Sequence, residues 1–167
     1  MDFEKIYVNA GEIIISHKPS ILWTDLGSCV SVIFHHPELK LSIFTHIVLP
    51  DKPFDNCLTV CTQTCFFNLD DKKYFKYLPC VFRFIMRYLN KYNINFRELK
   101  VSLYGGSDLF NFSYAVGKRN VEATLNLLKS NKFVISKMDT EGNASRRISH
   151  NSFSGETEII KLNKKYI

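Results

Sequence analysis

The chain has 167 residues, of which 46% are hydrophobic, and carries 22 Lys and Arg against 16 Asp and Glu, a net charge of +6. This length and hydrophobic content predict a single domain, residues 1–167, that can close its core without metal or disulfide cross-links. The basic residues are scattered, and no Lys/Arg run extends beyond a pair. The charge therefore does not indicate a nucleic-acid-binding protein.

The N-terminal stretch MDFEKIYVNAGEIIIS has acidic residues where a secretory signal is basic. No apolar run approaches the roughly 20 residues of a membrane-spanning helix. We therefore expect a cytoplasmic protein without membrane insertion. Because thiols stay reduced in the cytoplasm, the five cysteines are expected to be core residues, metal ligands or reactive groups rather than disulfides.

Four short apolar stretches in the first 50 residues are expected to be strands: residues 5–9, 12–17, 29–34 and 41–49. The polar segment HHPELK separates the last two stretches, and Pro37 breaks the strand there. This pattern predicts a β-hairpin with His35 and His36 in its turn. Residues 51–73 are polar and irregular, which predicts a long loop.

The second half of the chain mixes helices with strands. Apolar residues recur at helical spacing over residues 74–92, where Pro79 is acceptable only in the first turn. A second helix is expected over residues 121–129, with Asn120 as its N-cap. Three further strands are expected, at residues 99–104, 133–138 and 157–162.

The elements do not alternate as regular βαβ units. The sequence therefore predicts an α+β fold, a layered α/β sandwich of mixed β-sheets with two main flanking helices.

Cys29 follows Gly27-Ser28 directly and begins a predicted strand. If the hairpin turns symmetrically about Pro37-Glu38, paired residue numbers sum to 75 and Cys29 directly faces His46, with Cβ atoms about 4.5–5.5 Å apart. A neighbouring imidazolium would lower the pKa of the thiol, and the histidine could protonate a leaving amine and then activate water.

The Gly27-Ser28 turn could present backbone N–H groups to a developing oxyanion. The alternative is an inert core cysteine and a hydrogen-bonded histidine, because a one-residue change of register would separate the pair.

Cys57, Cys61 and Cys65 are four residues apart, and on a helix they would line one face. Three thiols at this spacing span about 12 Å along a helix axis, which is too far for one zinc ion without bending. We therefore expect no metal site.

Two further features allow two interpretations each. Gly105-Gly106 follows a predicted strand, and it either lets a substrate approach the backbone closely or forms a tight turn.

The Arg146-Arg147 pair either contacts acidic residues of a partner or is solvated surface charge, which is the usual state of arginine.

The sequence resembles the chemoreceptor glutamine deamidase (CheD) family over nearly its whole length. TDLGSCVSV followed by THIVLP is similar to the family's Gly-Ser-Cys strand and its His-containing strand ending in Leu-Pro. Further similarities, in the same order along the chain, are VNAGE, YGGS, VGKRNVEA, GNASRRI and SGET.

This resemblance implies hydrolysis of selected glutamine side chains on methyl-accepting chemotaxis receptors to glutamate, without a metal or organic cofactor. It implies that Cys29 is the nucleophile and His46 the base. The family's threonine, which orients the histidine, often lies six residues before the cysteine. Trp23 occupies that position here, and Thr24 lies five residues before Cys29.

We carry the threonine's role over to Thr24. Because successive residues of a strand face opposite sides, the shift of one residue raises a backbone carbonyl as the alternative partner of His46.

The resemblance also implies a second role, in which CheD-like proteins bind and stimulate a CheC-type phosphatase of the response regulator. A non-catalytic adaptor is therefore the alternative to the deamidase, and the displaced threonine is the feature that favours it. A cysteine hydrolase acting on another amide substrate is a third interpretation of the same residues.

Overall fold

The strands form two mixed sheets in the computed structural model, which describes residues 3–52, 57, 74–109 and 115–162. One sheet has the order β1-β3-β8-β9 and the other the order β2-β5-β4-β6-β7. The strands are β1 (Glu4–Tyr7), β2 (Ile13–Ser16), β3 (Ser20–Leu26), β4 (Val30–His36), β5 (Leu41–Thr45), β6 (Lys100–Gly105), β7 (Ile135–Thr140), β8 (Ser145–Asn151) and β9 (Thr157–Leu162). The pairs β1–β3 and β6–β7 are parallel, and the other neighbours are antiparallel.

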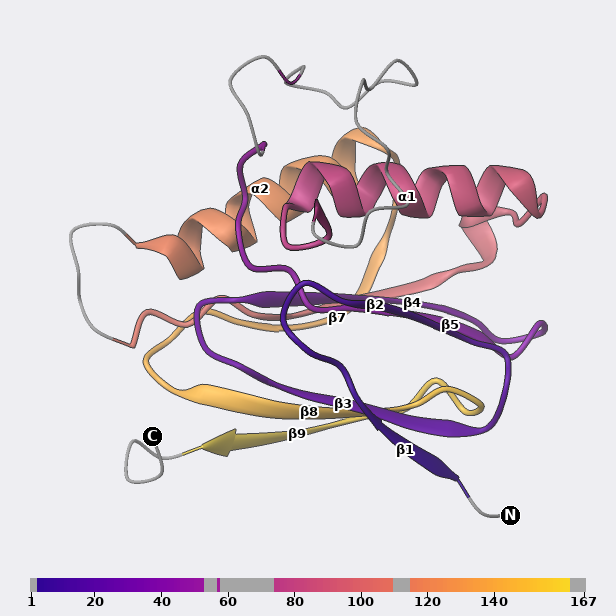
Figure 1. The fold of residues 1–167 in the computed structure, drawn as a ribbon, viewed down its shortest axis with the longest axis horizontal. Coiled ribbons are helices and arrows are strands. Elements are labelled where there is room, and N and C mark those ends of the chain that lie inside the picture. Colours follow the sequence, from indigo (N-terminus) through magenta and orange to yellow (C-terminus); the bar gives the residue numbers. More distant parts are fainter. Residues whose placement is uncertain (1–2, 53–56, 58–73, 110–114, 163–167) are drawn as a thin grey trace.

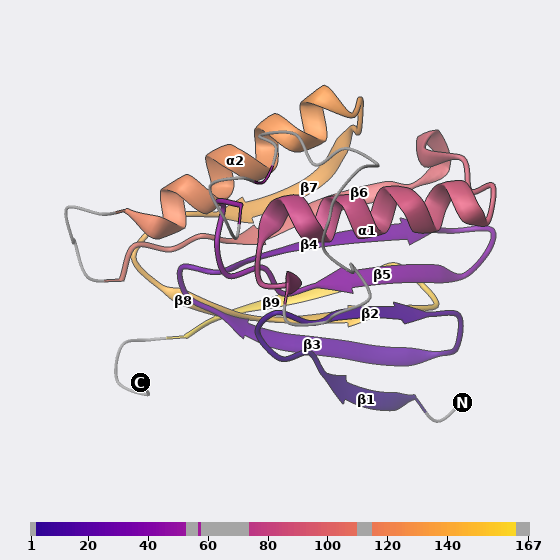
Figure 2. The same ribbon diagram turned by 45° about the horizontal axis from the view of Figure 1, so that its top comes forward.

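Helices α1 (Leu78–Lys91) and α2 (Val116–Ser130) lie over one face of the five-stranded sheet, and the four-stranded sheet lies against its other face (Figure 1; Figure 2). The predicted α+β layered sandwich with mixed sheets and two flanking helices is therefore confirmed. Among the described residues, no helix is long and apolar enough to span a membrane.

Two cores separate these layers. Alternate residues of β4 point to opposite faces, so Val32 and Phe34 pack against the helices while Ile33 packs between the sheets. The core under the helices is the larger. The core between the sheets is smaller and contains Leu22 and Leu26 of β3. Both faces of β4 are therefore buried, as expected for a central strand of a layered fold.

Strands and helices are present near all of the positions predicted from apolar spacing, although β5 ends at Thr45 rather than at residue 49. Pro79 lies in the first turn of α1, as expected. Strands β3 and β8 were not predicted, and they pair with each other in the middle of the four-stranded sheet. Much of the predicted loop over residues 51–73, including Cys61 and Cys65, lies outside the described residues.

Helix α2 begins at Val116, five residues before its predicted start, so the prediction that Asn120 is an N-cap is wrong. Gly117 lies in the first turn of this helix, and glycine has a low helix propensity. Here it is needed, because a Cβ at this position would collide with the backbone of Gly106 and Ser107. Asn120 is instead a buried residue inside the helix.

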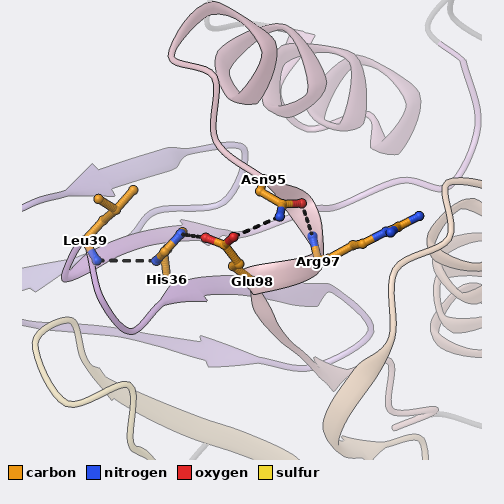
Figure 3. A network of polar contacts seen from close by, with 5 residues as sticks. All are labelled: His36, Leu39, Asn95, Arg97 and Glu98. Carbon is orange, nitrogen blue, oxygen red and sulfur yellow. Dashed lines mark hydrogen bonds and ion pairs between the residues drawn. The ribbon is translucent and has the colours of Figure 1, made fainter.

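His35 and His36 end strand β4, so their predicted place in the hairpin turn is wrong. The Leu39 N–H donates to His36 Nδ1 at 3.3 Å, which leaves Nε2 as the protonated nitrogen, 3.0 Å from Glu98 Oε2 (Figure 3). Asn95 donates to the other oxygen of Glu98 at 2.9 Å. This network ties the hairpin turn to the short 3-10 helix that precedes β6.

His35 and His150 form a pair that is buried between the two sheets. The Ser42 hydroxyl lies 2.9 Å from His35 Nδ1 and 2.8 Å from His150 Nε2. The two rings meet edge to face, with 5.8 Å between their centroids. Burial, assisted by nearby lysine charges, lowers the pKa of His35 to about 4, and burial lowers the pKa of His150 to about 3. Both rings are therefore neutral at pH 7.

This pair predicts that stability decreases in mild acid. Both folded-state pKa values lie below the ordinary value of 6.5, so the unfolded chain binds more protons than the native chain below that pH. The free energy of unfolding should fall between pH 6.5 and 4, by up to about 3 kcal/mol for each histidine.

A His150→Gln variant lacks one titrating group, so its stability deficit relative to the wild type should shrink from pH 7 to pH 4 in urea unfolding experiments. Replacement of the buried Thr124, which carries no titrating group, by Val is the control, and its stability deficit should not change with pH. A deficit of His150→Gln that stays constant over this range would contradict the prediction.

Candidate active site

Residues 27–29 carry the chain from β3 of one sheet into β4 of the other. Val30 exchanges two backbone hydrogen bonds with Ile47, at 3.0 and 2.8 Å, and the same register continues through the hairpin to the pair His36–Leu41. Paired numbers thus sum to 77, not 75. The predicted direct pairing of Cys29 with His46 is wrong, because the turn is centred one residue later than Pro37-Glu38.

Cys29 and His46 still lie on the same face of the sheet. A register shift of two residues preserves the alternation of side chains, so the two residues lie diagonally across the Val30–Ile47 pair. Val30 and Ile47 pack under the helices. Cys29 packs against the core between the sheets, and His46 reaches Thr24 of the opposite sheet. The thiol and the imidazole therefore share the space between the sheets.

Thr45 interrupts the strand pairing immediately before His46. Its hydroxyl accepts from the Val32 N–H and donates to the Val32 carbonyl, both at 2.9 Å, in place of the backbone. The backbone of His46 bonds on its other side, where its N–H donates to the Glu12 carbonyl and its carbonyl accepts from the Gly11 N–H. This local change ends β5 and fixes the backbone of His46.

Thr24 determines which nitrogen of His46 carries the proton. The threonine hydroxyl donates to the Val8 carbonyl at 2.7 Å and lies 2.8 Å from His46 Nδ1. Because its only hydrogen is directed at the carbonyl, Nδ1 is the donor in the second contact. Nε2 of the neutral ring is then unprotonated and can accept a proton.

The one-residue displacement of the threonine does not turn Thr24 away from His46. Thr24 lies on β3 of one sheet and Cys29 lies in the connection that leads to β4 of the other, so the alternation of faces cannot be counted from one residue to the other. Thr24 is fully buried between the sheets. Trp23, which occupies the family's usual threonine position, packs its ring against Tyr7 at 4.6 Å between centroids.

Hydrogen bonds from the scaffold occupy all three carbonyl groups of residues 27–29. The donors are the Ser107 N–H to Gly27 at 2.9 Å, the Asn120 side-chain amide to Ser28 at 2.8 Å and the Gly106 N–H to Cys29 at 2.8 Å. No other residue in the described ranges accepts a hydrogen bond from the N–H of Ser28 or Cys29. These two N–H groups are therefore free to donate to another group.

Gly105 and Gly106 allow this close packing. A Cβ at Gly105 would collide with the Cys29 carbonyl, and one at Gly106 would collide with Val121 of α2. Their φ angles are 103° and 70°, which favour glycine. Of the two interpretations of this pair, these contacts favour the tight turn. The Gly106 N–H already donates to Cys29, so it supports the site rather than a substrate.

Arg146 is buried, with 2% relative exposure, so its interpretation as solvated surface charge is wrong. Its guanidinium donates to the carbonyls of Gly105 and Glu141, both at 2.7 Å. It therefore connects β8 of one sheet to the end of β6 in the other. The neighbouring Arg147 is half-exposed and pairs with Asp25 at 2.7 Å.

Burial opposes a resting thiolate–imidazolium pair. It raises the pKa of the Cys29 thiol above its ordinary value, an effect that the residue's own N–H partly offsets. Burial also lowers the pKa of His46, with smaller opposing effects from the Val8 carbonyl and nearby carboxylates. Both shifts favour a neutral thiol beside a neutral imidazole.

The chain matches the family model described as CheD chemotactic sensory transduction over residues 67–161. It is 25% identical to a probable chemoreceptor glutamine deamidase CheD of Maridesulfovibrio salexigens, over 98% of this chain and 95% of the relative. It is 27% identical to the chemoreceptor glutamine deamidase CheD of Thermotoga maritima, over 95% and 92%. It is 30% identical to a probable chemoreceptor glutamine deamidase CheD of Lachnoclostridium phytofermentans, over 96% of each. With this coverage, and with the Gly-Ser-Cys crossover and its histidine in place, the chain belongs to the CheD family.

Proposed function

We propose that this protein hydrolyses the side-chain amide of selected glutamines in the cytoplasmic part of methyl-accepting chemotaxis receptors to glutamate. The observation that carries the proposal is the hydrogen bond between Thr24 and His46, which leaves Nε2 of the ring unprotonated in the space shared with Cys29. The names of the relatives supply the substrate class, since they are called chemoreceptor glutamine deamidases.

The reaction begins when Cys29 Sγ attacks the carboxamide carbon and its proton passes to His46 Nε2. The N–H groups of Ser28 and Cys29 stabilise the negative oxygen that forms. The C–N bond then breaks, and the imidazolium gives its proton to the departing ammonia. Water attacks the thioester with His46 as base, which releases glutamate and restores the thiol. One water is consumed and one ammonia is released, and no step uses a metal or an organic cofactor.

Peptide mass spectrometry of a receptor cytoplasmic fragment tests this function. The wild type should convert specific glutamines to glutamate, and Cys29→Ala should convert none because it lacks the nucleophile. Cys57→Ser is the control for loss of a thiol and should remain active. Ammonia release from a different protein amide, with no change in any cognate receptor, would support the broader cysteine hydrolase instead.

Replacement of Thr24 tests the orientation of His46. Thr24→Val keeps the shape but removes the nearer acceptor of the Nδ1–H and leaves only the Val8 carbonyl, at 3.3 Å, so kcat should fall about 10-fold through poorer orientation of the base. Thr24→Ser retains the hydroxyl and should retain most of the activity. Equal kcat values for the two variants, measured as glutamate formation, would show that the hydroxyl does not orient the base.

The protonation state of Cys29 can be read from its alkylation by iodoacetamide as a function of pH. Because burial raises the pKa of this thiol, the rate should rise with a midpoint above the ordinary value of 9.0. The same protein unfolded in urea is the control, and its midpoint should fall toward that value. A native midpoint below about 8 would indicate a preformed thiolate–imidazolium pair.

Binding and stimulation of a CheC-type phosphatase is the alternative role. The sequence favoured it through the displaced threonine, and the contact of Thr24 with His46 removes that reason. The Cys29→Ala variant separates the two roles. If it stimulates the phosphatase but releases no ammonia, while the wild type does both, one protein carries both activities.

A further inference from the structure

Asn120 is a polar side chain on the buried face of α2, with no exposed surface. Its neighbours along that face are Gly117, Val121, Thr124 and Leu128. A buried amide destabilises a fold unless its polar atoms are hydrogen bonded, so its partners indicate what it contributes.

Both hydrogens of the Asn120 amide are directed at the catalytic segments. Nδ2 donates to the Ser28 carbonyl at 2.8 Å and to the Val48 carbonyl at 3.0 Å. Ser28 directly precedes Cys29, and Val48 lies two residues after His46. Within the described part of the chain, no backbone N–H donates to either carbonyl. Asn120 thus connects the two strands just beyond their last backbone pair.

The Ser28 carbonyl and the Cys29 N–H belong to the same peptide group. In a planar trans peptide these two bonds point in opposite directions. Because Asn120 holds the carbonyl toward α2, the N–H must point toward the opposite side, where the Cys29 thiol lies. This N–H also lowers the pKa of that thiol, as expected for a donor directed at it.

The oxygen of the Asn120 amide indicates that the two Nδ2 hydrogen bonds determine the orientation of this side chain. The Asn120 Oδ1 is buried and has no hydrogen-bond partner among the described residues. A rotation of the amide by 180° would place this oxygen against two carbonyl oxygens, so only the observed orientation is attractive. The fold therefore accepts an unsatisfied oxygen to keep both donors in place.

Building on the deamidase function proposed above, we propose that Asn120 is a positioning residue, which directs the Cys29 N–H at the oxyanion of the reaction. Without it, the peptide can rotate and turn the Ser28 carbonyl toward the site. A carbonyl oxygen there would repel the oxyanion that the N–H stabilises. Asn120 touches neither substrate nor thiol and acts only through this peptide.

The test compares Asn120→Leu, which has similar volume but no donor, with Thr124→Val on the same buried face. The Thr124 hydroxyl donates only to the carbonyl of Asn120 within the helix, so its removal is a matched loss of a buried polar group. With a receptor cytoplasmic fragment as substrate, Asn120→Leu should lower kcat about 10- to 100-fold with little change in KM. Thr124→Val should leave both constants near those of the wild type.

Alkylation of Cys29 by iodoacetamide forms no oxyanion, so above the thiol pKa its rate should change less than about 3-fold in Asn120→Leu. If kcat and the alkylation rate fall in parallel, the substitution disturbs the thiol itself and the proposal is wrong. If kcat equals that of Thr124→Val, the proposal is also wrong.

The direction of the peptide can be measured without any activity. The N–H residual dipolar coupling of Cys29 reports this direction, and it should change in Asn120→Leu but not in Thr124→Val. An unchanged coupling would overturn the proposal. If the wild type modifies no receptor, the deamidase function proposed above is wrong. The dipolar coupling of Cys29 then decides by itself whether Asn120 sets the direction of the peptide. Asn120→Ala, which introduces no new bulk, replaces the Leu variant if that variant does not fold.

Discussion

The carbonyl groups of Gly27, Ser28 and Cys29 all accept hydrogen bonds from α2 or from the turn after β6, and because peptide groups are planar these bonds also fix the directions of the N–H groups that follow them. The chain leaves one sheet and has not yet joined the other here, so its N–H groups have no strand to pair with. The donors come from α2 and from the turn after β6. A layered fold with a crossover between its sheets can therefore leave backbone donors available without leaving the carbonyls unpaired.

The two sheets contribute different parts of the site. Cys29 and His46 adjoin the ends of β4 and β5 of the five-stranded sheet, whereas Thr24 lies on β3 of the four-stranded sheet and Val8 directly follows β1. Arg146 fastens the sheets together through the Gly105 carbonyl, close to Cys29. Because the threonine acts across the interface, the tautomer of His46 depends on the sheets being correctly packed. The core between the sheets thus serves stability and, in the proposed reaction, proton transfer.

The sequence predicted what depends on local patterns and missed what depends on long-range pairing. Helix α1 was predictable from its apolar periodicity, and the motifs around Cys29 and His46 singled these two residues out as a candidate pair. Strand β8 was not, because its buried face carries Arg146 and His150, whose polar side chains resemble those of a loop. The proposed role of Asn120 could not be inferred from the sequence because the start of α2 was predicted too late. With the helix starting at Val116, Asn120 lies on the same buried face as Val121 and Leu128.

Burial of the site also bears on when Cys29, the proposed nucleophile, becomes reactive. With the thiol pKa raised and that of the imidazole lowered, Cys29 is largely protonated at neutral pH and is a poor target for oxidants and alkylating agents. In the proposed mechanism, proton transfer to His46 becomes favourable only when attack on a carbonyl carbon consumes the thiolate, and the resulting oxyanion is then stabilised by the N–H groups of residues 28 and 29. The same burial that suppresses the ion pair at rest strengthens these hydrogen bonds. Under this proposal the reactivity of Cys29 is conditional on a bound amide, which suits an enzyme that modifies only selected side chains.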